Sequence, residues 1–102
     1  MIYYFDGKPM NYAELQERID DLQTEGKTYF AVGTGTGSEN TSLDVSQDDD
    51  YFTDSEKAKA IFQKKIASSY VGDRYVVMEV YSPENDYRAE IMEIWYSKGG
   101  KK

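Results

Sequence analysis

Two stretches of the chain have the apolar spacing of an amphipathic helix. In the first, Asn11 and Glu14 stand at the separation of a capping box, which predicts a helix beginning after Asn11. Gly26 is placed to end this helix in the left-handed conformation. The apolar stripe has members three or four positions apart, namely Tyr12, Leu15, Ile19 and Leu22. We therefore expect this stripe to be buried and the charged residues between its members to face water.

The second amphipathic stretch is predicted to begin near Thr53, with Glu56 at the capping-box separation. Residues of its expected inner face are Ala58, Ile61, Phe62, Ile66 and Ser69. Its expected outer face carries Lys57, Lys64 and Lys65.

The remaining apolar positions predict β-strands. Strands are expected at residues 2–5, 28–32, 41–46, 74–81 and 87–96. Asp6-Gly7 and residues 82–86 have the composition of turns. The resulting order is β-α-β-β-α-β-β, which indicates an α+β fold. Because neighbouring strands are joined by short loops, we expect a two-layer arrangement of an antiparallel sheet with both helices on one face.

The chain is expected to form one domain. Neither repeats nor a change of composition divides it, so residues 1–98 are predicted to be a single α+β domain and residues 99–102 a flexible tail. Its apolar runs are shorter than a membrane helix needs, and its first residues lack the pattern of a signal peptide. A cytoplasmic protein without membrane contact is the expectation.

Composition limits the chemistry. The 102 residues include neither Cys nor His, which excludes thiol nucleophiles, thiolate zinc sites and histidine-based triads. A further possibility is a pair of carboxylates among Glu79, Glu90 and Glu93 that could act on a glycoside. A chain this small seldom forms a deep sugar cleft, so we expect no enzyme and no cofactor.

Net charge points to the kind of partner. The formal charge is −7, and it is unevenly divided, with a net −10 in residues 1–56 and +3 in residues 57–102. An acidic surface repels phosphates and attracts cationic surfaces, so direct nucleic-acid binding is not expected. A basic protein surface, such as that of a nucleic-acid-binding effector, is the expected partner.

The densest acidic stretch is the candidate binding site. It comprises Asp48, Asp49, Asp50, Tyr51, Asp54 and Glu56. An EF-hand loop counted from Asp48 would need glycine at its sixth position and glutamate at its twelfth, but Thr53 and Lys59 stand there. No metal site is predicted. Three interpretations stay open: a solvated loop with a helix N-cap, an acidic docking surface, and a loose Mg²⁺ or Ca²⁺ site.

Two other features invite a functional interpretation. The glycines of residues 33–37 resemble a phosphate loop, but strand-like residues and not a helix follow them, so a hairpin is favoured. The chain also has ten tyrosines. Tyrosine suits both half-buried sheets and protein-binding surfaces, and on an open sheet face it could support a homo-oligomer.

A resemblance adds to these inferences. The opening Ile2-Tyr-Tyr-Phe-Asp-Gly-Lys8, followed by the capped helix of residues 11–25, resembles short proteins of phages and mobile elements. The small size, the acidity, the missing Cys and His and the abundance of Asp and Tyr are similar to anti-CRISPR and other counter-defence proteins. This resemblance implies a non-enzymatic inhibitor that occupies a basic, nucleic-acid-binding surface of an effector in a bacterial host. A homo-oligomeric assembly protein is the alternative, and a carboxylate-dependent metalloenzyme is the third.

Overall fold

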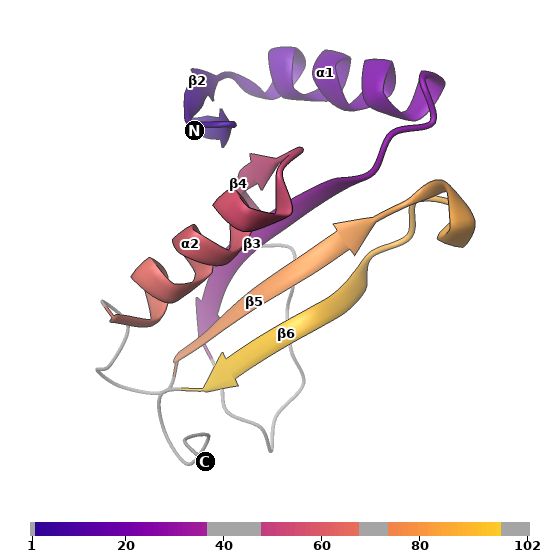
Figure 1. Ribbon diagram of the computed structural model, residues 1–102. Coiled ribbons are helices and arrows are strands. Elements are labelled where there is room, and N and C mark those ends of the chain that lie inside the picture. The colour runs from indigo at the N-terminus through magenta and orange to yellow at the C-terminus, as the bar shows by residue number, and fades with distance from the viewer. Residues whose placement is uncertain (1, 37–47, 68–73, 97–102) are drawn as a thin grey trace.

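The computed structural model describes residues 2–36, 48–67 and 74–96 (Figure 1). It is an α+β fold, as predicted, with two helices and a six-stranded sheet. The elements are β1 (Tyr3–Phe5), β2 (Lys8–Met10), α1 (Tyr12–Thr24), β3 (Tyr29–Thr36), β4 (Asp48–Phe52), α2 (Ser55–Ala67), β5 (Arg74–Tyr81), the 3₁₀ turn η1 (Pro83–Asn85) and β6 (Glu90–Tyr96). Neither helix of this part of the chain is long and apolar enough to cross a membrane.

The sheet is mixed and not purely antiparallel. Its strand order is β2-β1-β4-β3-β5-β6, and every neighbouring pair is antiparallel except β1 and β4. Those two run parallel, with Tyr4 opposite Asp50 and Phe5 opposite Tyr51. The short Asp6-Gly7 turn adds β2 as an extra edge strand and leaves β1 beside β4, which arrives from a distant part of the sequence. A local rule about short loops could not predict this long-range pair.

The helices cover opposite faces of the sheet, which corrects the expectation that they share one face. Along a strand, successive side chains point to opposite faces. Phe52 belongs to the buried cluster of α2, whereas its neighbour Tyr51 packs against the cluster of α1. On β3, Val32 lies in the first cluster and Tyr29, three positions away, in the second. The sheet therefore separates two small cores.

The two cores are formed by different residues. The α2 core consists of Val32, Phe52, Ala58, Phe62, Val76 and Met78. The α1 core consists of Phe5, Leu15, Leu22 and Tyr29. Full burial of one Leu or Phe side chain contributes about 1.5–3 kcal/mol. Because each core has few buried residues, the loss of one such side chain removes a large share of its stabilisation.

The limits of α1 follow the predicted signals. The Asn11 side chain accepts a hydrogen bond from Glu14 N, and Glu14 Oε1 accepts one from Asn11 N, which completes the capping box. At the other end Gly26 has φ +72°, and the N–H groups of Gly26 and Lys27 donate to Gln23 O and Leu22 O. These two bonds form a Schellman motif, which requires the left-handed residue that glycine supplies.

The predicted apolar stripe of α1 is only partly buried. Leu15 and Leu22 are buried, Ile19 is half-buried, and Tyr12 is 61% exposed. Tyr12 is the first residue of the helix, where it lies beside the short strand β1 and its ring packs only at the edge, against Tyr3. Burial of this position was therefore a wrong prediction.

The second helix begins two residues later than expected. Asp54, and not Thr53, precedes its first turn, and Asp54 Oδ1 accepts from Glu56 N while Asp54 O accepts from Ala58 N. Ala58 and Phe62 are buried as predicted, and Ile61 and Ile66 pack at the margin of their core. Ser69 lies outside the described residues.

The last two strands form the predicted hairpin. The connection holds Asp86 and Tyr87 in the left-handed conformation, with φ of 54° and 56°. An aromatic residue rarely adopts this backbone. Here Tyr87 is held by three contacts: its N–H donates to Ser82 O, its hydroxyl donates to Lys27 O at 2.8 Å, and its ring stacks on Tyr29. The turn is thereby fixed to the segment that joins α1 to β3.

Candidate protein-docking surface

The acidic stretch does not form a loop, because Asp48, Asp49 and Asp50 lie in β4. The strand predicted at residues 41–46 falls outside the described residues, and the strand that pairs with β3 is instead Asp48–Phe52. Backbone pairing on both sides of β4 outweighs the low strand propensity of aspartate. The roles of Asp48 and Asp49 in binding stay predictions.

Asp50 is paired within the protein. Its Oδ2 atom lies 3.0 Å from Lys65 Nζ of α2, and both side chains are only about one-fifth exposed (19% and 21%). The ion pair joins β4 to the last turn of α2 on the face that α2 covers. A carboxylate already neutralised in this way contributes little to long-range attraction of a cationic partner.

The other predicted site residues have structural contacts or separate positions. Tyr51 points to the opposite face, where its ring stacks on Phe5. Asp54 is exposed but caps α2, and Glu56 is exposed with Lys59 at 3.7 Å. The six residues therefore do not present one continuous acidic patch through their described side chains.

The turn between β1 and β2 is hydrogen-bonded to the segment that joins β4 to α2. Asp6 lies in the left-handed conformation, with φ of 54°. Its carboxylate accepts hydrogen bonds from Thr53 N at 3.1 Å and from Thr53 Oγ1 at 3.2 Å, and its own N–H donates to Tyr51 O. Asp6 is thus a structural residue that sequence reasoning treated only as part of a turn.

The three glutamates considered for glycoside chemistry are separated by the sheet. Glu79 is 1% exposed and pairs across the strands with Ile91. Glu90 and Glu93 are exposed and pair with Val80 and Met78, which point to the other face. The carboxyl of Glu79 instead accepts a hydrogen bond from Tyr81 Oη at 3.3 Å. Glu79 therefore forms no catalytic pair with either of the other two.

No metal centre is found among the residues whose positions are described. Within that part of the chain, three or more Asp or Glu side chains nowhere gather closely enough to hold an ion. In particular, Asp50 is engaged with Lys65 and Asp54 with the backbone of α2.

The predicted tyrosine surface is largely interior. Tyr75 is fully buried, and Tyr81, Tyr87 and Tyr96 are half-buried. Tyr29 stacks between Tyr81, at 4.9 Å, and Tyr87, at 6.0 Å. Burial raises the pKa of the Tyr29 hydroxyl, partly offset by the hydrogen bond that Gln23 donates to its oxygen at 3.2 Å. These rings serve packing between α1, β3 and the β5–β6 hairpin.

A stronger acidic surface lies on α1. The helix carries four acidic residues, Glu14, Glu17, Asp20 and Asp21, against the single cation Arg18, a net charge of 1 − 4 = −3. All four are exposed, and none makes an ion pair within the described residues. By contrast, α2 carries four lysines and Glu56, a net charge of 4 − 1 = +3. Because the helices cover opposite faces of the sheet, the helix on one face is acidic and the helix on the other face is basic.

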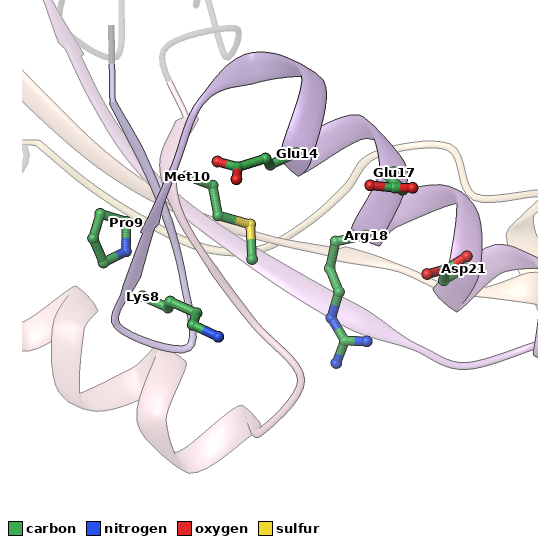
Figure 2. Close-up of a pocket in the computed structure, with 7 residues that line it drawn as sticks. All are labelled: Lys8, Pro9, Met10, Glu14, Glu17, Arg18 and Asp21. Atoms are coloured by element: carbon green, nitrogen blue, oxygen red, sulfur yellow. The ribbon is translucent and has the colours of Figure 1, made fainter.

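A hollow of about 300 Å³ adjoins the acidic helix α1. It lies between β2 and α1 and is lined by Lys8, Pro9, Met10, Glu14, Glu17, Arg18 and Asp21 (Figure 2). Figure 2 shows Lys8 extending toward this space from β2 and Arg18 from α1, with the Met10 thioether between them. The Arg18 guanidinium also lies over the Phe5 ring, 5.4 Å from its centroid.

The hollow owes its lining to helical periodicity. Glu14, Glu17, Arg18 and Asp21 stand at positions i, i+3, i+4 and i+7, so one side of α1 presents all four. Its dimensions are at the lower end for a ligand site. Pro9 and Met10 can contact the aliphatic stem of a basic side chain, and the carboxylates of the hollow can bind its charged end. The cations Lys8 and Arg18 limit the positions that this charge can occupy.

Sequence reasoning recognised these α1 residues only as the solvated side of a helix. The signal that could have identified them was the net −10 of residues 1–56, to which α1 contributes −3. Comparison of the chain with protein-family models, with curated protein sequences and with solved structures gives no match.

Proposed function

We propose that the protein is a non-enzymatic docking module whose α1 face binds a basic protein surface. The observation that carries this proposal is the separation of charge across the sheet, with −3 on α1 and +3 on α2. Such a charge distribution orients the molecule as it approaches a cationic partner, so that α1 arrives first. The hollow beside Arg18 then offers a place for one side chain of the partner.

The proposed partner is the basic, nucleic-acid-binding surface of a bacterial effector, and the proposed role is that of a phage-type inhibitor. An acidic helix can neutralise the cations that otherwise hold phosphates. The net charge of −7 and the unpaired carboxylates of α1 support this proposal. Asp50 is not part of this proposed surface, because its carboxylate pairs with Lys65.

A charge-matched pair of variants tests the role of α1. The first variant is Glu17→Gln/Asp20→Asn/Asp21→Asn, and the control removes three exposed charges elsewhere, Glu56→Gln/Glu84→Gln/Asp86→Asn. Both have a net charge of −4, so any difference between them reports the position of the charges. A ten-residue oligolysine peptide is titrated into each ¹⁵N-labelled protein in low salt.

We expect the α1 variant to lose at least about tenfold in affinity, or about 1.4 kcal/mol, and the control to lose less than about threefold. Equal losses in the two variants would contradict a specific role for α1.

The inhibitor proposal has its own test. If the protein occupies the nucleic-acid-binding surface of an effector captured at low salt, added DNA should displace the protein from that effector. A ternary complex of protein, effector and DNA would contradict the proposal.

A further inference from the structure

The two edges of the sheet differ in how they are protected (Figure 1). The edge strand β2 has three residues and includes Lys8 and Pro9, and both residue types discourage pairing with another strand. The opposite edge strand, β6, has seven residues without Lys or Pro. Within the described residues, no strand pairs with the outer side of β6. In the described part of the chain, β6 is therefore the edge at which a further strand can pair.

The side chains of β6 are unusually exposed for a strand of this length. Ile91 is 47% and Met92 46% exposed, although both are large apolar residues. Glu90 and Glu93 are exposed as well, and neither forms an ion pair within the described part of the protein. Exposed apolar residues on an unpaired edge are the usual mark of a strand that receives a partner.

The register determines which face each of these residues occupies. The ladder between β5 and β6 shifts between Met78 and Glu79, so that Met92 is the additional residue. As a result Glu90 and Glu93 both pair with residues that point to the α2 face, whereas Ile91 pairs with Glu79 on the other face. At the open edge, Glu90 and Glu93 thus lie on the α2 face, which they share with the partly buried Trp95, and the exposed Ile91 lies on the other face.

We infer that the outer edge of β6 binds an extended basic peptide segment by strand addition. Lys or Arg residues of the segment lie on the face of Glu90 and Glu93, and an apolar residue lies beside Ile91. Backbone hydrogen bonds supply affinity in this mode and alternate side chains supply selectivity. Charge complementarity favours this occupant over a second copy of the chain, because antiparallel pairing of two β6 strands centred between Glu90 and Glu93 would place glutamates of both copies opposite one another.

The test uses three seven-residue synthetic peptides with the ¹⁵N-labelled full chain. One alternates Lys and Val, one alternates Glu and Val, and one alternates Lys and Gly, which keeps the charge but disfavours a strand. Chemical shifts and amide exchange rates of β6 are the readout. We expect the Lys-Val peptide alone to shift the β6 amides and to slow their exchange.

Variants then distinguish this surface from α1. As followed at the β6 amides, Glu90→Lys/Glu93→Lys should weaken binding of the Lys-Val peptide at least tenfold and allow the Glu-Val peptide to bind, whereas Glu56→Lys/Glu84→Lys has the same net charge and should do neither. Equal shifts of the β6 amides by the Lys-Gly peptide, or shifts by the Lys-Val peptide that are confined to α1, would overturn the inference. A concentration-dependent dimer whose β6 amides are protected without peptide would also overturn it. The charge-neutralised α1 variant should still bind through β6, so the two proposals can fail separately.

Discussion

The separation of the two cores leads to a sharp prediction about mutational coupling. Leu22 of α1 and Val76 of β5 are both almost fully buried, but they belong to different clusters on opposite faces of the sheet. Truncations at positions without shared contacts usually have additive effects on stability. We therefore expect Leu22→Ala and Val76→Ala to act independently.

The magnitudes follow from the groups removed. Leu22→Ala deletes most of a fully buried side chain and should cost about 2–5 kcal/mol of unfolding free energy. Val76→Ala removes two methyl groups at about 0.8 kcal/mol each, so with the cavity it leaves it should cost about 2 kcal/mol. A domain of this size is typically stable by about 5–15 kcal/mol, which leaves room to measure the double variant at low denaturant.

Urea unfolding of the wild type, both single variants and the double variant completes the cycle. The coupling free energy should be below about 0.5 kcal/mol. A matched control pairs Val76→Ala with Phe62→Leu, since both residues lie in the α2 core, and there the coupling should exceed about 0.5 kcal/mol. A coupling above about 1 kcal/mol between Leu22 and Val76 would refute the assignment of the helices to opposite faces.

Two further predictions concern ionisable groups. Because burial raises the Tyr29 pKa above 10.0, the unfolded state releases this proton first as the pH rises. Burial of the neutral hydroxyl therefore contributes its full stabilisation below about pH 10 and loses it as the pH rises further. Above about pH 10, the stability of the wild type in denaturant unfolding should fall more steeply than that of Tyr29→Phe; parallel curves would contradict this. Asp50→Asn removes the carboxylate that lies 3.0 Å from the partly buried Lys65 and should cost about 1–2 kcal/mol. Glu56→Gln removes only an exposed pair with Lys59 and should cost less than about 0.5 kcal/mol, so equal urea midpoints would show that the Asp50 pair contributes no stability.

The candidate site shows how local and long-range information differ. The charge asymmetry between the two helices is visible in the sequence, because each helix can be recognised from its own spacing. That the charges face opposite ways is not visible, since it depends on which face of the sheet each helix packs against. Nothing within residues 11–26 specifies that face.

In the acidic stretch, long-range contacts override what the local sequence pattern predicts. Three consecutive aspartates look like a loop, yet Asp50 pairs with Lys65, fifteen positions away, and stands opposite Tyr4 of a parallel strand. Tertiary pairing overrides strand propensity here because both edges of β4 find backbone partners. The ion pair then removes one of the charges on which the predicted site depended.

The sequence by itself determined the elements whose signals are local. It specified the capping box of Asn11 and Glu14, the left-handed Gly26, the buried Ala58 and Phe62 of α2 and the β5–β6 hairpin, because each is signalled by a pattern of residues a few positions apart. Only the tertiary structure decided the parallel pairing of β1 with β4 and the opposite faces of the helices. The strand pair joins Tyr4 to Asp50, which are far apart in the sequence, and the face that each helix covers is selected by the packing of the whole chain.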